Sequence, residues 1–441
     1  MRVNLRIVSE DDFDPEAMAE FLRELLSQQN GMDPEQLAAA AGLANDPKAL
    51  AELMKQLQRS LAESSKDVVG GVNWKLATEQ SRKFAAEGAF AVSEAERTGL
   101  SNATSIAELW LDEATSLPRL SNTPKLITRE LWVGDALPLF QELSQPIASR
   151  MADALTENLQ QNMPEELAGM LAGAGGMLRS AGGTIFAMQL GQTLGKLSKE
   201  VLSGGDLGLP FFAEQRAVFV PQNIAEYAKE LEIPKDQLLI FLSIRELAHA
   251  RLFKQSKWLR DSVVSQIINY ASGISIDSER MSELAEGFDF NDQERLREAL
   301  GNGELLSDRT PDQERALANI ETTLALIEGW VEAVTDEASK RLPQAATLSE
   351  LQRRRRATGS PAQATFSTLV GLELRPKRIR EAAAMWRAVT DAVGTQKRDA
   401  LWNHPDLMPT SGDIDNPGGL VSKLRDTHDD AMDAELRKLL D

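Results

Sequence analysis

Long stretches with apolar residues at helical spacing dominate the sequence from about residue 69 onward. Examples are VNWKLATEQSRKFAAEGAF, VSEAERTGLSNATSIAELWLDEAT and ERALANIETTLALIEGWVEAVTDEA, which are separated by polar turns. Apolar residues three and four positions apart lie on one face of a helix, so each stretch can bury one face against its neighbours. Strand-like runs are few: QRAVFVP (215–221) is the best, and residues 117–133 hold a second candidate. The sequence therefore predicts a mainly α fold with a minor β element.

The N-terminal residues form a separate stretch of short predicted helices. Two apolar-patterned segments, PEAMAEFLRELLSQ and DPKALAELMKQLQRSLAES, are interrupted by QQNGMDP and GLANDP. The glycine, proline and asparagine residues of these interruptions are typical of turns. We therefore predict a variable, partly mobile helical region at 1–68 and a helical domain at 69–441.

The charge and the histidine content restrict which kinds of site the chain can carry. A net charge of −19 opposes binding to phosphates, so we predict no nucleic-acid partner. Because there is no cysteine, disulfides, thiolate metal sites and cysteine catalysis are excluded. The histidines are His249, His404 and His428, and His428 lies in a polar tail where we expect it to be solvated.

A glycine-rich stretch at 167–208 is the candidate for a membrane helix. Gly183, Ala187, Gly191 and Gly195 recur at every fourth position, which gives a helix a smooth stripe for close packing. Charged and amide side chains interrupt the apolar run, whereas a span needs about 18 or more consecutive apolar residues. We therefore predict a buried helix and no transmembrane span. Because the N-terminus shows no signal-peptide pattern, we also expect a cytoplasmic protein.

Four successive arginines, Arg353 to Arg356, form a local run of positive charge. Such a run can bind an anion, or it can end a helix whose arginines pair with carboxylates elsewhere in the fold. Because the chain is strongly acidic, we predict pairing with carboxylates.

The segment IRELAHARLF (244–253) carries the candidate active helix. In zinc proteases with His-Glu-x-x-His, the two histidines project from one face of a helix onto one ion, and the glutamate polarises the metal-bound water. Here Glu246 and His249 occupy two of these positions, but Arg245 replaces the first histidine. A guanidinium stays protonated and offers only donors, so Arg245 cannot bind a cation. Taken alone, the pattern is also what a hydrogen-bonded pair on an ordinary helix would show.

A later helical segment, ALIEGWVEAV (325–334), offers a further carboxylate. Glu328 is followed by Gly329, whose missing side chain permits close approach of a metal or a partner helix. With His249, Glu328 would supply two metal ligands. A third could come from His404 in NHPDL or from Asp406, although His404 can equally cap or pack within its own loop.

Several sequence blocks from residue 69 onward resemble one known family in their order and spacing. They are VNW (72–74), AELWLDEAT (107–115), GLPFF (208–212), PQNIAEYA (221–228), RELAHARLF (245–253), ALIEGWVEAV (325–334), RRRRATGSPAQATFSTLVGLELRPKRIREAAAMWR (353–387) and LWNHPDLMPTSGDIDNP (401–417). The chain is similar to the zincin-like metallopeptidase family of actinobacteria. Members of that family are described as hydrolases, as zinc-dependent metalloproteases or as associated with deazaflavin-cofactor biosynthesis. The resemblance implies a zincin-like multi-helix domain, with Glu246 and His249 on the active helix and Glu328 as a metal ligand.

Two functions remain open at this stage. In the first, the protein is a zincin-like hydrolase in which Glu246 is the general base and His249, Glu328 and His404 hold zinc. In the second, Arg245 supplies the positive charge in place of zinc and forks onto Glu246 or Glu328. The protein is then a metal-free pseudo-peptidase that binds a peptide or protein partner. A membrane-surface role for the glycine-rich helix is a third, weaker reading. The replacement by Arg245 favours weak or lost peptidase activity, and the sequence assigns neither a substrate nor an oligomeric state.

Overall fold

The computed structural model describes the chain in ten stretches: 68–69, 72–161, 183–184, 186–209, 212, 216–275, 277, 280, 307–357 and 377–426. By its internal contacts the chain divides into two units, Met1–Asp67 and Val68–Asp441, and every described residue belongs to the second. The predicted N-terminal region up to residue 67 and the tail residue His428 lie outside the described residues.

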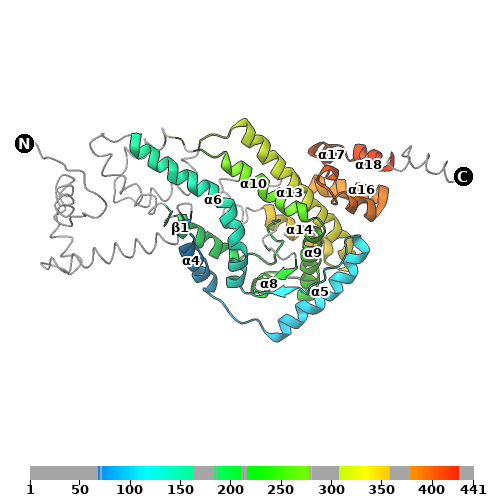
Figure 1. Ribbon diagram of the computed structural model, residues 1–441. Coiled ribbons are helices and arrows are strands. Elements are labelled where there is room, and N and C mark those ends of the chain that lie inside the picture. Colours follow the sequence, from blue (N-terminus) through cyan, green and yellow to red (C-terminus); the bar gives the residue numbers. More distant parts are fainter. Residues whose placement is uncertain are drawn as a thin grey trace, which may run out of the picture. The chain divides into compact units, whose positions relative to one another are not determined.

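Helices make up most of the described residues, which confirms the prediction of a mainly α fold (Figure 1). The α-helices are α4 (Trp74–Ala86), α5 (Glu94–Ala114), α6 (Arg129–Gln161), α8 (Pro221–Lys229), α9 (Lys235–Gln255), α10 (Lys257–Ser272), α13 (Pro311–Ala338), α14 (Ala345–Ala357), α16 (Ile379–Ala400), α17 (Ser411–Asp415) and α18 (Pro417–Asp426). The described residues also include two short 3₁₀ helices, η1 (Ser339–Arg341) and η2 (Pro405–Leu407).

The β structure of the described residues is limited to short pairs, which confirms the predicted minor β element. Strands β1 (Val68–Val69) and β2 (Val72–Asn73) pair antiparallel. Strands β3 (Lys125–Leu126) and β4 (Val218–Phe219) pair parallel, with Lys125 opposite Val218. These two strands fall inside the two segments that the sequence predicts as strand candidates. Strand β4 is extended on its other side by an isolated antiparallel bridge from Ser203 to Phe219.

Helices α9 and α13 form the centre of the described core. Every residue of α9 from Leu238 to Phe253 is buried, and so is every residue of α13 from Thr323 to Thr335. A helix that is buried on all sides must have neighbours on all sides. Helix α9 packs against α5 and α13, and α13 packs in addition against α10 and α16 (Figure 1). Polar side chains in the middle of α9 or α13 are therefore enclosed and need partners from other elements.

The helical residues 186–198 pack closely against α4. A Cβ atom on Gly191 would lie 2.6 Å from Cβ of Gln80 and 2.8 Å from the carbonyl oxygen of Ala77, so only glycine permits this approach. The predicted smooth stripe thus serves helix packing within the core. Across the described helices, no segment combines the length and apolar character that a membrane crossing requires.

Candidate functional site

The three residues of the degenerate motif lie in the buried middle of α9. Arg245 is 8% exposed, Glu246 is 2% exposed and His249 is 3% exposed. Removing a charged group from water costs several kcal/mol (order of magnitude) unless it is paired or hydrogen-bonded. The partners that these side chains find therefore determine what the site can do.

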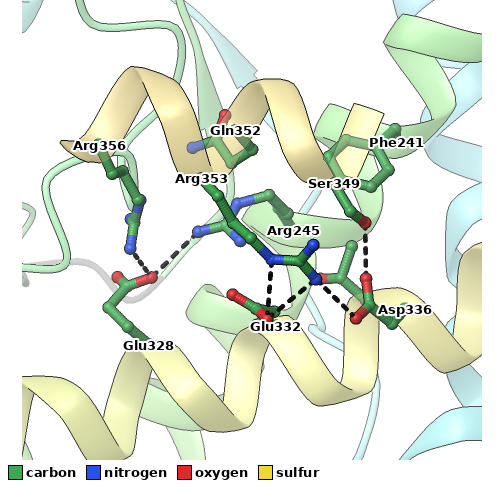
Figure 2. A pocket seen from close by; sticks show the side chains of 10 residues that line it. Phe241, Arg245, Glu328, Glu332, Asp336, Ser349, Gln352, Arg353 and Arg356 are labelled. Atoms are coloured by element: carbon green, nitrogen blue, oxygen red, sulfur yellow. Dashed lines mark hydrogen bonds and ion pairs between the residues drawn. The ribbon is translucent and has the colours of Figure 1, made fainter. Parts of the chain in front are cut away.

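Glu328 of α13 is the partner of both Arg245 and His249. Nε2 of His249 lies 2.8 Å from Oε1 of Glu328. Nη2 of Arg245 donates to Oε2 of the same carboxylate at 3.0 Å (Figure 2). Arg356, at the end of α14, donates through Nη1 to the same Oε2 atom. Burial alone would raise the pKa of the Glu328 carboxyl, but Arg356, His249 and Arg245 hold that pKa far below its usual range. Glu328 is therefore an ionised carboxylate with both oxygens engaged.

Glu246 is held by backbone groups, and the structure records no bond between it and Arg245. Its Oε1 accepts from the backbone N–H of Val218 at 2.7 Å, and its Oε2 accepts from that of Gly205 at 2.7 Å. Burial raises the pKa of Glu246 to about 7, and the two backbone hydrogen bonds offset only part of this effect. This carboxylate thus ties the active helix to β4 and to the loop that carries Gly205.

That loop lies directly on the site, because three glycines let its backbone approach the motif side chains. A Cβ on Gly204 would lie 2.9 Å from Oε1 of Glu246, and a Cβ on Gly205 would lie 2.6 Å from Cγ of His249. Gly208 has a φ of +73°, and a Cβ there would lie 2.7 Å from Oε1 of Glu328. Such distances are shorter than real Cβ contacts, so each glycine marks a direct contact between the loop and one site carboxylate or ring.

The loop is also fastened to α14 by ion pairs. Asp206, whose side chain is 5% exposed, accepts from Nη1 of Arg355 at 2.7 Å. Nη2 of Arg356 donates to the backbone carbonyl of Asp206 at 3.1 Å. Burial would raise the pKa of the Asp206 carboxyl, but Arg355 holds it below its usual value. Arg356 therefore bridges Glu328 and the loop that covers it.

A small pocket lies beside Arg245, between α9, α13 and α14 (Figure 2). It has room for about one water molecule. Its wall includes Glu332 and Asp336 of α13, which pair with Arg353 of α14. The predicted pairing of the arginine run with carboxylates is thus what the structure shows. Each of the four arginines contacts at least one Asp or Glu side chain.

His404 lies in the turn that begins η2. Its side chain is 62% exposed, and its Nδ1 accepts from the backbone N–H of Asp406 at 3.2 Å. The polar contacts recorded for His404 stay within this turn, and none reaches His249 or Glu328. Of the candidate metal ligands, the structure thus brings His249 and Glu328 together and places His404 as a capping residue.

The donor set around Glu328 does not fit a zinc site. Zinc requires about three protein ligands, whereas His249 and Glu328 are joined by two guanidiniums that cannot be ligands. A metal-bound histidine also donates its second ring N–H to an acceptor. Nδ1 of His249 is buried and has no hydrogen-bond partner in the described structure. An imidazole ring with its proton on Nε2, donated to Glu328, accounts both for the contact with Oε1 and for an Nδ1 atom without a partner. Among the described residues, no three His, Cys, Asp or Glu side chains are arranged to hold a metal ion.

Several site residues were not identified from the sequence. In the sequence Arg356 is only one member of an arginine run, and Asp206 and the three loop glycines belong to no recognisable site motif. The available signal was the density of glycine at 204, 205 and 208, since repeated glycines in a loop often mark close backbone approach. What they approach is decided by residues far away in the sequence.

A solved structure shares this fold. The crystal structure of a protein described as a candidate hydrolase with a novel fold, from Chloroflexus aurantiacus, matches with a TM-score of 0.55 and 21% sequence identity. The match covers 80% of this chain and 99% of that one. Among curated proteins, no sequence matches the chain.

Family comparison covers most of the described unit. Residues 72–421, which include α9, α13 and α14, match the zincin-like metallopeptidase family. The match includes the complete candidate site, from the loop glycines to the arginines of α14. The chain therefore belongs to the zincin-like metallopeptidase family.

Proposed function

We propose that this protein is a zincin-fold pseudo-peptidase with weak or lost zinc-dependent activity, and that it acts as a peptide- or protein-binding module. The observation that supports the proposal most strongly is the occupation of Glu328. Its Oε2 accepts from Arg245 and Arg356, and its Oε1 lies against His249. Charge-assisted bonds of this kind provide the positive charge that the carboxylate would otherwise take from a metal ion.

Zinc-dependent hydrolysis is the second candidate function, and one observation favours it. The pKa of Glu246 is raised to about 7, which is the range in which a general base works best near neutral pH. Against it, both oxygens of Glu246 accept backbone N–H groups, so the carboxylate is committed to the loop and β4. The cytoplasmic location stays a prediction that rests on the sequence.

Metal content separates the two functions. The protein should be purified without chelators, and its zinc should be measured by elemental analysis beside a melting curve with and without added zinc. We expect far less than about one zinc per chain and a melting temperature that added zinc leaves unchanged. About one zinc per chain that disappears in His249→Ala would overturn the proposal.

Restoring the missing histidine provides the matched test. Arg245→His creates two histidines four positions apart on α9, with Glu328 as a third ligand, while Arg245→Gln removes the same charge without adding a ligand. We expect Arg245→His to gain zinc binding over Arg245→Gln, and Arg245→His with Arg356→Gln to bind zinc more tightly still. If the histidine variants bind zinc no better than the glutamine variant, the site geometry is not that of a zincin.

A further inference from the structure

We propose that the chain's own segment 202–209, here named the covering segment, occupies the position of a peptide ligand on this site, with its first residues paired to β4 and the rest folded as a turn. The partner that fits the site is then a peptide with the same chemistry: small residues followed by an acidic residue. This inference rests on the proposed function as a peptide-binding module, and it identifies the class of peptide.

The covering segment pairs with β4 as an added strand would. The backbone N–H of Gly204 donates to the carbonyl of Val218 at 2.9 Å, and that of Val220 donates to the carbonyl of Leu202 at 3.0 Å. Ser203 and Phe219 lie opposite each other in an antiparallel bridge. Peptides that bind by strand addition use these same main-chain bonds, which do not depend on side-chain identity. Another chain can therefore form the same main-chain hydrogen bonds with β4.

The positions that follow require residues without bulky side chains. Gly205 lies against the ring of His249 and donates its N–H to Glu246, and Gly208 lies against Glu328 with a positive φ. A side chain at either position would collide with the site. The site thus selects small residues by close backbone contact, as a peptide pocket with shallow subsites does.

Asp206 fastens the covering segment. Its Oδ1 accepts from Arg355, and its Oδ2 accepts from the backbone N–H of Leu202 at 2.9 Å, which closes the segment into a tight loop. Nη2 of Arg355 also donates to the carbonyl of Glu200 at 2.6 Å. These guanidinium bonds are charge-assisted and carry more specificity than the strand pairing. A peptide that replaces the segment must bring its own carboxylate to Arg355 and a backbone carbonyl to Arg356.

The experiment weakens this fastening and offers the same chemistry from outside. In the full-length chain, Asp206→Asn removes the carboxylate. Asp336→Asn is the matched control, because it removes one carboxylate partner of Arg353 on the same helix without touching the segment. The probe is a labelled synthetic peptide, LSGGDLGL, which has the sequence of residues 202–209, with LSGGNLGL as its control. Binding is followed by fluorescence anisotropy, and backbone amide exchange of 202–209 by mass spectrometry.

We expect amide exchange in 202–209 to rise about tenfold in Asp206→Asn and to stay at the wild-type rate in Asp336→Asn. LSGGDLGL should bind Asp206→Asn about tenfold more tightly than it binds the wild type, because the internal segment competes at high effective concentration in the wild type. LSGGNLGL should show no such preference. If exchange in 202–209 and peptide affinity are the same in wild type and Asp206→Asn, the inference is wrong.

Two further measurements keep the outcome decisive. If Asp206→Asn fails to fold, Arg355→Gln removes the same ion pair from the other side. Amide exchange in 202–209 should then rise as well, whereas LSGGDLGL should lose its advantage over LSGGNLGL because the guanidinium that contacts the carboxylate is gone. Zinc content is measured on the same samples. A wild type that holds zinc would contradict the proposed function. Wild-type amide exchange of the covering segment in both Asp206→Asn and Arg355→Gln would contradict this inference alone.

Discussion

A single residue, Arg245, changes the chemistry of the whole site. In the zincin pattern its position carries a metal ligand, and here it carries a fixed positive charge that donates to Glu328 at 3.0 Å. The charge is buried, so it persists only because the carboxylate is within reach. Arg245 does not act on this carboxylate alone, because Arg356 donates to the same Oε2 atom from α14. The positive charge beside Glu328 is thus supplied by two helices, α9 and α14.

The energetic coupling of Arg245 and Glu328 is the first residue-scale prediction. Glu328→Gln leaves the buried guanidinium of Arg245 and the half-buried one of Arg356 without this carboxylate and should cost about 3–5 kcal/mol of unfolding free energy. Arg245→Met leaves Glu328 with Arg356 and should cost less. Because the two single variants remove the same ion pair, the double variant should fall short of additivity by about 1–3 kcal/mol.

Urea unfolding of the four proteins in this cycle provides the measurement. The control pairs Arg245→Met with Asp336→Asn, whose recorded bonds are with Ser349, Arg353 and Arg387. The changes in unfolding free energy caused by these two substitutions should add to within about 0.5 kcal/mol. Full additivity of Arg245→Met with Glu328→Gln would mean that the arginine does not stabilise this carboxylate.

At the scale of elements, the site depends on how closely the core helices approach one another. Gly329 follows Glu328 on α13, and a Cβ there would lie 2.7 Å from both Cβ of Ala382 and the backbone nitrogen of Ala383. The glycine therefore permits close packing of α13 on α16, whereas Glu328 contacts Arg245 and His249 of α9. Both roles were open from the sequence, and helix packing is the one that the structure shows at Gly329.

Two glycine-to-alanine substitutions test this packing. Gly329→Ala should lower the unfolding free energy by about 1–3 kcal/mol, because backbone of α16 must move to make room. Gly99→Ala in α5 is the control, since its new Cβ meets only Cδ1 of Leu239 at an ordinary 3.7 Å. There the gain in helix propensity should leave stability unchanged or raise it by about 0.5–1 kcal/mol. Equal effects of the two substitutions in urea unfolding would contradict the close approach of α13 and α16.

At the scale of the whole molecule, the buried carboxyls give stability a distinctive dependence on pH. The pKa of Glu246 is raised from its ordinary 4.5 to about 7, so between these values the folded state binds more protons than the unfolded state. Its contribution to stability is therefore present at low pH and is lost as pH rises through this window. The pKa values of Glu328 and Asp206 are lowered, so their contributions are lost as pH falls below the ordinary carboxyl range.

Glu246→Gln isolates the first of these two effects. As pH rises from about 4.5 to about 7, the wild type should lose about 3 kcal/mol of unfolding free energy relative to the variant, at about 1.4 kcal/mol per pH unit of pKa shift. Glu328 and Asp206 are present in both proteins, so their effect cancels in the difference. Urea unfolding at half-unit pH steps measures it, and a difference that stays constant across this window would show that Glu246 is already ionised at pH 4.5.

The sequence by itself determined the helical class, the short strands near residues 125 and 218, and the fact that the motif carries an arginine in place of a metal ligand. These features follow from local periodicity, turn residues and the impossibility of an arginine ligand, which nearby residues suffice to determine. Only the tertiary structure decided that His404 stays in its own turn, that Arg356 reaches Glu328, and that Gly204, Gly205 and Asp206 cover the motif helix. Those contacts join segments far apart in the chain, and they depend on how closely packed helices bring backbone and side chains together. Hydrophobic periodicity selects the faces that pack, but it contains no information about which charge on one helix will meet which carboxylate on another.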